Sequence, residues 1–327
     1  MKGSRRISKP PPYCLIVTLM MFFTFVCLIL HQFSYKSNTQ SLVHSQHDFE
    51  RKTLLQALRK ASMADRTVIL TVINGNWAKP ASVLDLFLES FRIGEGTKRL
   101  LNHLLIIAED SQAFQYCNSK HSHCFQLKNF PKIQPRTPRN LMLSPSRVIL
   151  LTQIVELGYH VAFTNADVMW LRNPLSKLVP DIELSIACEL YLMDAETYGI
   201  SGDGGFFHLK TNERTYQFMK NLNLKRVLYP DSEHQSLCKV SGKDGFIDLI
   251  RMKVSYFSEV NFGRLCLPCD LNQIYTIQAN CCEDIDSKIH DLKLVLDDWR
   301  KFKELSANNA SSKWSPLSWR APQKCIA

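Results

Sequence analysis

The sequence predicts an α/β domain with a mostly parallel sheet and helices on both faces. Two observations support this prediction. Runs of β-branched and aliphatic residues alternate along the chain with segments of helical period, and glycine or proline marks many of their boundaries. At 327 residues with 45% hydrophobic composition, the chain is long enough for one large domain of this kind or two smaller ones.

The first strand and helix begin the predicted domain, which spans residues 66–327. Residues 67–73 form a continuous β-branched run that stops at Asn74-Gly75-Asn76-Trp77, as expected of a buried parallel strand that ends in a turn. Pro80 stands where the first turn of a helix should begin, and residues 81–92 continue at helical period. The same signals predict the remaining elements, with strands at 104–108, 159–164, 184–188 and 205–209, and helices at 111–119, 144–157, 211–222 and 286–305.

The strand predicted at 159–164 ends in a short polar tip, Asn165-Ala166-Asp167, after which apolar residues resume. Ligands bind beyond the carboxyl ends of the strands in sheets of this kind, and hard divalent cations take oxygen ligands. Asp167 is therefore a candidate metal ligand, and the metal would bridge the phosphates of a nucleotide sugar. Ordinary turn chemistry uses the same residue types and is the alternative interpretation.

Two other segments are candidates for the same site. His290 lies at the start of the helix predicted at 286–305, where a neutral imidazole could bind metal and the helix N-terminus favours phosphate. Gly204 and Gly205 precede a strand, and paired glycines let the backbone approach a ligand closely. A solvated histidine and an ordinary tight turn are the alternatives.

The N-terminal segment predicts a membrane anchor. Basic residues without an acidic one occupy the tail, 1–12, and an apolar run follows at 13–31, which is roughly long enough to cross a bilayer as a helix. The run has no small-residue cleavage site, so an uncleaved anchor is expected, with a cytosolic tail and a lumenal domain. Residues 32–65 are largely polar and are interpreted as a stem.

Charge and cysteine content limit which binding partners and which cellular compartment are expected. The net charge of +10 suits phosphates or an acidic polysaccharide, but no dense Lys/Arg cluster with interleaved aromatics predicts nucleic-acid binding. Nine of the 11 cysteines lie outside the anchor, where oxidation is permitted, so disulfides and at least one remaining thiol are expected. Cys117 and Cys124 are close enough to close a small loop. Thiol exchange at Cys266 and Cys269 is disfavoured, because a redox pair should open a helix after a strand. Zinc binding by these two with Cys281 and Cys282 is disfavoured, because lumenal cysteines default to disulfides.

From about residue 67 to 325 the chain resembles the plant nucleotide-diphospho-sugar transferase domain, glycosyltransferase family seventy-seven. The resemblance depends on long strings of residues. They are Leu84-Asp85-Leu86-Phe87-Leu88-Glu89-Ser90-Phe91-Arg92-Ile93-Gly94-Glu95-Gly96-Thr97, Ala166-Asp167-Val168-Met169-Trp170-Leu171-Arg172-Asn173-Pro174, Gly204-Gly205-Phe206, Ala279-Asn280-Cys281-Cys282 and Ser287-Lys288-Ile289-His290-Asp291-Leu292.

The resemblance implies a GT-A fold and a Golgi-resident, single-pass type II membrane protein. It implies transfer of a sugar, expected to be a pentose, from a UDP-sugar to a cell-wall polysaccharide or glycoprotein, with retention at the anomeric carbon and with Mn²⁺. Other Golgi glycosyltransferases are possible partners. Carried over by position, Asp167 and His290 would bind the metal, and Asp167 and Gln235 would be the catalytic residues. The donor pocket would be lined by Asn165, Gly204 and Gly205, and the nucleotide would be flanked by Thr71 to Asn74.

The chain departs from the family pattern at this site. The family usually has Asp-Ala-Asp where this chain has Asn165-Ala166-Asp167, and His-Asp-Gln-Asp where it has Glu233-His234-Gln235-Ser236. Replacing one carboxylate by an amide at a charged contact loses roughly 1.5 to 3 kcal/mol. The alternative hypothesis is therefore an impaired or inactive relative that holds or localises an active transferase.

Overall fold

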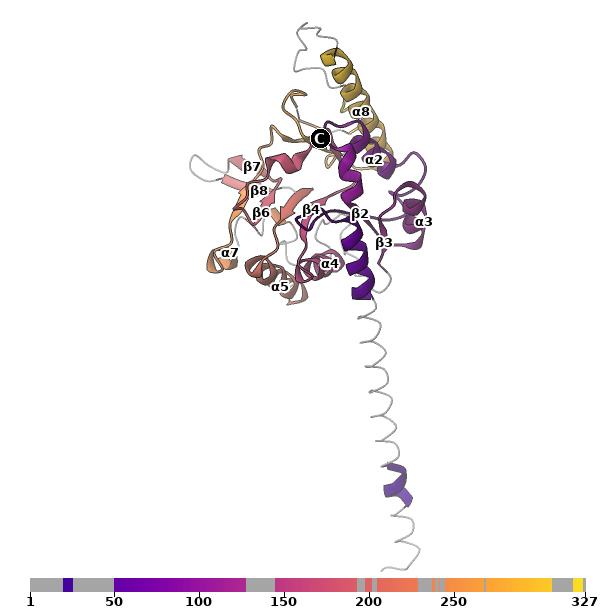
Figure 1. Cartoon of the computed structure of the whole chain (residues 1–327), viewed down its shortest axis with the longest axis vertical. Coiled ribbons are helices and arrows are strands. Elements are labelled where there is room, and N and C mark those ends of the chain that lie inside the picture. The colour runs from indigo at the N-terminus through magenta and orange to yellow at the C-terminus, as the bar shows by residue number, and fades with distance from the viewer. Residues whose placement is uncertain are drawn as a thin grey trace, which may run out of the picture. The chain divides into compact units, whose positions relative to one another are not determined.

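A seven-stranded sheet forms the centre of the fold in the computed structural model (Figure 1). Its strands lie in the order β10-β6-β9-β4-β1-β2-β3, and only β9 is antiparallel to its neighbours. Their bounds are Thr67–Ile73 (β1), Leu104–Ala108 (β2), Cys124–Gln126 (β3), His160–Thr164 (β4), Leu184–Ile186 (β6), Phe206–Leu209 (β9) and Val254–Tyr256 (β10). The predicted α/β fold with a mostly parallel sheet is confirmed.

The structure describes residues 20–25, 50–127, 145–192, 198–201, 205–228, 237–238, 241, 245–267, 269–307 and 320–325. Contacts divide the chain into an N-terminal part, Met1–Leu54, and a folded unit, Leu55–Ala327. A helix covers residues 50–61 within the predicted stem. Most of the predicted anchor lies outside the described residues, and within the described residues no helix combines the length and apolar character needed to cross a bilayer.

Helices cover both faces of the central sheet, as predicted. Helices α4 (Pro145–Glu156) and α5 (Glu213–Leu228) pack together on one face, and α2 (Val83–Ile93), α3 (Ser111–Lys120) and α8 (Ile285–Ala307) lie on the other (Figure 1). The second face is rich in buried aromatic side chains, which include Phe87, Phe91, Trp170, Phe206 and Trp299.

Short elements complete the fold. A small sheet joins β11 (Phe262–Arg264), β12 (Thr276–Gln278) and β5 (Val168–Trp170). A second joins β7 (Glu189–Leu192) to β8 (Tyr198–Ser201), and α7 covers Gly245–Leu249. Two 3-10 helices cover Lys98–His103 and Pro174–Lys177. Because β5 follows β4 after a three-residue turn, the chain leaves the central sheet at the polar tip and enters the small sheet there.

The helix predicted at residues 81–92 begins later than expected. Ala81 has a φ of 57°, which is not helical, and α2 begins at Val83 after Ser82. The carboxylate of Asp85 accepts the backbone N–H of Ala81 at 2.8 Å, and the hydroxyl of Ser82 donates to the carbonyl of Trp77 at 2.7 Å. These side-chain hydrogen bonds hold the segment after β1 as a loop. Trp77 in this loop lies beside Lys288, which pairs with Asp167 of the polar tip.

Gly94 is required by a close backbone approach at the end of α2. A Cβ atom at this position would lie 2.4 Å from the carbonyl oxygen of Trp170 and 2.9 Å from that of Ser90. We expect Gly94→Ala to lower the free energy of unfolding by about 1 to 3 kcal/mol, because the backbone must shift to relieve the overlap. Gly245→Ala is the matched control, since its Cβ would meet nothing within 4 Å. Equal urea midpoints for the two variants would contradict this prediction.

Four disulfides form within the described residues, joining Cys117 to Cys124, Cys188 to Cys238, Cys266 to Cys281 and Cys282 to Cys325. The small loop expected between Cys117 and Cys124 is confirmed. Cys269 keeps its thiol, and burial raises the pKa of that thiol to about 11. Because Cys266 bonds to Cys281 and the Cys269 thiol is poorly ionised at neutral pH, these two cysteines are not a redox pair.

Candidate functional site

The polar tip lies at the carboxyl end of β4, and its backbone is held from two sides. The N–H of Asn165 donates to the carbonyl of Gly205 at 2.8 Å, which ties the tip to the start of β9. The N–H of Ala279 donates to the carbonyl of Asp167 at 3.1 Å, which ties it to the end of β12. Asn165, Asp167 and Gly205 are therefore neighbours, as the sequence predicted.

Asp167 is buried and forms an ion pair with a lysine from the last helix. Its exposed fraction is 4%, and its Oδ2 atom lies 2.5 Å from the Nζ atom of Lys288. Its Oδ1 atom is also buried and has no hydrogen-bond partner in the described part of the chain. One carboxylate oxygen is thus engaged by a protein cation, and the other is left for a ligand or for a shift of the side chain.

Lys288 brings a third segment to the tip. Its Nζ atom lies 5.0 Å from the centre of the Trp77 ring, which belongs to the loop after β1. The carbonyl of Asn74 accepts the N–H of Trp77 at 3.0 Å, so the conformation of the loop fixes the tryptophan. The loops after β1 and β4 and the first turns of α8 therefore meet at Lys288, although they lie far apart in the sequence.

The predicted residues of β1 have different environments. Thr71 is completely buried within the sheet, opposite Ile106 of β2, and its hydroxyl oxygen has no hydrogen-bond partner within the described ranges. Asn74 lies in the loop after the strand and is only partly buried. Of these two residues, only Asn74 lies outside the sheet, beyond the carboxyl end of β1.

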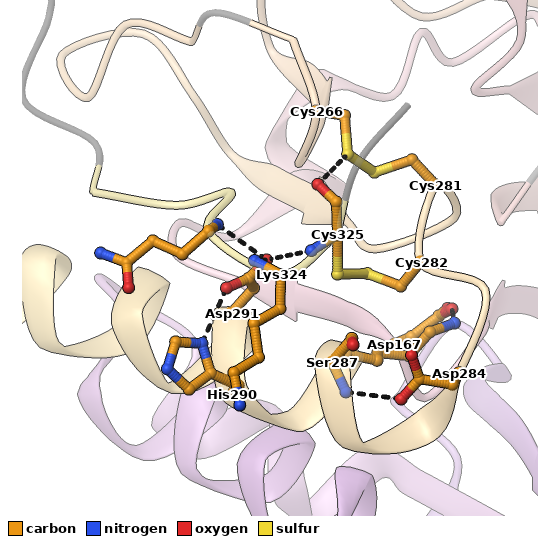
Figure 2. The surroundings of a disulfide bond; sticks show 12 residues. Asp167, Cys266, Cys281, Cys282, Asp284, Ser287, His290, Asp291, Lys324 and Cys325 are labelled. Atoms are coloured by element: carbon orange, nitrogen blue, oxygen red, sulfur yellow. Dashed lines mark hydrogen bonds and ion pairs between the residues drawn. A yellow bond between two sulfur atoms is a disulfide. The ribbon is translucent and has the colours of Figure 1, made fainter.

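His290 does not lie with Asp167. Its Nδ1 atom is 2.9 Å from the Oδ1 atom of Asp291, and Figure 2 shows its ring on the side of α8 away from Asp167. Sequence reasoning selected His290 and missed Lys288, which stands two positions earlier and contacts the tip directly. Gly204 and Gln235 lie outside the described residues, as do His234 and Ser236.

Asp291 connects α8 to the C-terminal segment. Its Oδ2 atom accepts the backbone N–H groups of Gln323, Lys324 and Cys325 at 2.7 to 3.0 Å (Figure 2). Burial alone raises the pKa of this carboxyl, but the bonds from Cys325, His290 and the neighbouring backbone outweigh it, and the pKa is lowered from 3.8. With the Cys282–Cys325 disulfide, Asp291 holds residues 323–325 against the start of α8.

This lowered pKa predicts a pH dependence of stability. The stabilisation from Asp291 should be complete above pH 3.8 and should be lost as the pH falls through the lower pKa of the folded state. We expect Asp291→Asn to lower the free energy of unfolding by about 1.5 to 3 kcal/mol at pH 7 and to weaken its fall in acid. Urea titrations at pH 7 and pH 3 measure both effects. Parallel pH profiles for the variant and the wild type would contradict this prediction.

A cleft lies beside the polar tip, between the central sheet and the small sheet of β5, β11 and β12. Its lining mixes apolar and polar side chains, among them Val168, Phe206, Glu259, Arg264, Gln278 and Asn280. The amide group of Gln278 packs against Gly205 next to the cleft, where a Cβ atom would lie 2.2 Å from its Nε2 atom and would displace that amide. Val168, the residue after Asp167, is the lining residue nearest to the tip in sequence.

The described residues do not fit the predicted manganese ion. Asn165 offers an amide oxygen instead of a carboxylate, and the charge of Asp167 is already balanced by Lys288 at 2.5 Å. No three His, Cys, Asp or Glu side chains gather as metal ligands in the described ranges. A divalent cation on Asp167 would also be repelled by the neighbouring ammonium group.

Comparison with known proteins identifies a family. Residues 99–292 match the family model described as nucleotide-diphospho-sugar transferase. The Arabidopsis thaliana protein At4g15970, which is uncharacterized, is 31% identical over 86% of this chain and 76% of its own length. A second uncharacterized Arabidopsis thaliana protein, At1g28695, is 30% identical over 92% of each chain.

Solved structures show only a weak likeness. A glycosyltransferase involved in glycosylation of the major capsid of PBCV-1 aligns with a TM-score of 0.40 at 12% identity, over 69% of this chain and 98% of that one. Mouse xyloside xylosyltransferase 1 aligns with a TM-score of 0.38 at 12% identity, over 66% and 98%.

Proposed function

Because the chain belongs to the nucleotide-diphospho-sugar transferase family, we propose that it transfers a sugar from a UDP-sugar to an acceptor hydroxyl. The observation that supports this best is the meeting of Trp77, Asp167 and Lys288 at the carboxyl edge of the sheet. Ligands of such sheets bind at that edge, and the start of α8 adds a helix N-terminus that favours phosphate. The central sheet also supports the GT-A type of domain implied by the resemblance.

The transfer exchanges one bond at the anomeric carbon for another. The bond from this carbon to the diphosphate breaks and UDP leaves with the electron pair, while the acceptor oxygen forms the new bond and loses its proton. We propose retention of configuration, with Gln235 facing the donor sugar and with Asn165, Gly204 and Gly205 lining its pocket.

The cellular setting is proposed from the N-terminal sequence and the cysteines. We propose a single-pass type II protein of the Golgi membrane, with the transferase domain in the lumen. Disulfides persist in oxidising compartments, and four form within the described residues. A pentose donor, a cell-wall polysaccharide or glycoprotein acceptor and a Golgi glycosyltransferase partner follow from the family resemblance.

A panel of UDP-sugars tests the proposal. The full-length protein in mild detergent would be incubated with each UDP-sugar, and released UDP would be measured alongside a calorimetric titration with UDP. We expect UDP to bind and at least one UDP-sugar to be turned over. A protein that binds neither UDP nor any UDP-sugar, with or without Mn²⁺, is not the proposed transferase.

Ligand binding without turnover is the second candidate. The amide at Asn165 favours it, because the family has a carboxylate there. In that case UDP binds in the calorimeter, but no UDP-sugar in the panel is hydrolysed or transferred. Turnover that disappears in Asn165→Ala, with UDP binding retained, would exclude this candidate.

A further inference from the structure

We propose that the ammonium group of Lys288 takes the place of the divalent cation, so that the donor diphosphate binds without metal. This inference builds on the proposed function, since it concerns the same donor site. It follows from the disagreement between the manganese implied by the family and the residues that surround Asp167 in this chain.

Lys288 has the charge and the donors that the role requires. A lysine ammonium carries three N–H donors. One of them is directed to the Oδ2 atom of Asp167 at 2.5 Å, and the ring of Trp77 lies on another side at 5.0 Å from Nζ. The side-chain exposure of Lys288 is 8% and that of Asp167 is 6%. In such a site a charge–phosphate contact is screened little by water.

The backbone of Lys288 is fixed in place. The carbonyl of Asp284 accepts the N–H of Lys288 at 3.2 Å, and its carboxylate accepts the N–H of Ser287 at 2.8 Å, which caps the first turn of α8. Just before the helix, Cys281 and Cys282 are bonded to Cys266 and Cys325 (Figure 2). The lysine is therefore held on a rigid element, as a preorganised binding group should be.

The lysine pair needs a carboxylate at Asp167 but none at Asn165. A divalent cation is normally held by one or two carboxylates together with the phosphates. A single ammonium group needs only one carboxylate to balance and orient it, and Asp167 supplies that carboxylate. Asn165 then lies beside the pair without adding a second negative charge that would repel a diphosphate.

Calorimetric titration of UDP into the full-length protein tests the proposal. The titration is run once with EDTA and once with Mn²⁺. We expect wild-type protein to bind UDP with the same Kd in both buffers. Binding that requires Mn²⁺ would overturn the lysine proposal and leave the proposed function in place, whereas no binding in either buffer would overturn the proposed function itself. This comparison uses no variant, so it does not depend on whether a variant folds.

A matched pair of variants on α8 then tests whether Lys288 is the cation that binds the diphosphate. Lys288→Met should weaken UDP binding in EDTA on the order of tenfold to 100-fold, because it removes a hydrogen bond to a charged group. Lys293→Met, at an exposed position one turn later, should leave the Kd unchanged. Circular dichroism and the thermal midpoint confirm that each variant is folded. A folded Lys288→Met protein that binds UDP in EDTA as tightly as the wild type contradicts the proposal.

Discussion

Replacing Asp167 with alanine should lower the free energy of unfolding by about 3 to 5 kcal/mol, because Lys288 would then be a buried charge without its carboxylate. Both side chains are almost completely buried, at 6% and 8% exposure, so solvent screens the pair little. Urea unfolding under non-reducing conditions measures the change. The same substitution should weaken UDP binding by no more than Lys288→Met does, because the lysine stays in place and loses only the group that orients it.

A double variant separates the loss of the whole pair from the loss of one partner. Asp167→Leu combined with Lys288→Met removes both charges and should recover most of the lost stability, while UDP binding stays as weak as in Lys288→Met. Asp297→Ala is the exposed control, since Asp297 and Arg300 form an ion pair 2.8 Å long at the surface of α8. That control should change stability by less than about 1 kcal/mol. If Asp167→Ala loses as little stability as Asp297→Ala, the buried ion pair stabilises the fold no more than the exposed one.

Replacing Trp170 with alanine should cost about 3 to 5 kcal/mol of stability, since it removes a completely buried indole. The indole stacks on Phe91 of α2 with ring centres 4.5 Å apart, and its Nε1 atom donates to the hydroxyl of Thr164 at 3.2 Å. Thr164 is the last residue of β4. Trp170 therefore closes the turn that carries Asp167, and any folded fraction of the variant should also bind UDP more weakly.

Two controls sharpen this second prediction. Trp170→Phe keeps the ring stacking and loses only the indole hydrogen bond and part of the volume, so it should cost clearly less than the alanine variant. Leu249→Ala removes a large side chain that is 76% exposed, and it should leave stability unchanged. Urea midpoints rank the three variants. A Trp170→Ala protein as stable as Leu249→Ala would contradict the packing described here.

Five of the seven strands of the central sheet could be predicted because they carry strong local signals, whereas the edge strands β3 and β10 have only three residues each and were not predicted. The run at residues 67–73 matches β1 at both ends, and the run at 104–108 matches β2. The small sheet of β5, β11 and β12 could not be predicted, since each strand has three residues and β5 joins β12 from over 100 residues away. The antiparallel direction of β9 is likewise set by its pairing with β4 and β6.

The candidate site could be predicted only in part. The sequence predicts Asp167 because it follows a buried strand. In the last helix it favours His290 over Lys288, because histidine is the commoner metal ligand. A signal for Lys288 was present in the helical period. It lies four residues before Leu292 and seven before Val295, on the buried face of α8, whereas a solvated lysine would lie on the other face. A charged residue on such a face needs a partner, and here the partner comes from the tip of a strand over 100 residues away.

Hydrogen–deuterium exchange of the full-length protein, with and without saturating UDP, tests the location of the donor site most directly. The account predicts slower exchange in three separate segments when UDP is bound: residues 74–80 after β1, residues 165–170 after β4, and residues 285–292 at the start of α8. Exchange in α4 and α5, on the opposite face of the sheet, should not change. Protection of α4 or α5 by UDP, with no change at 165–170 and 285–292, would contradict it.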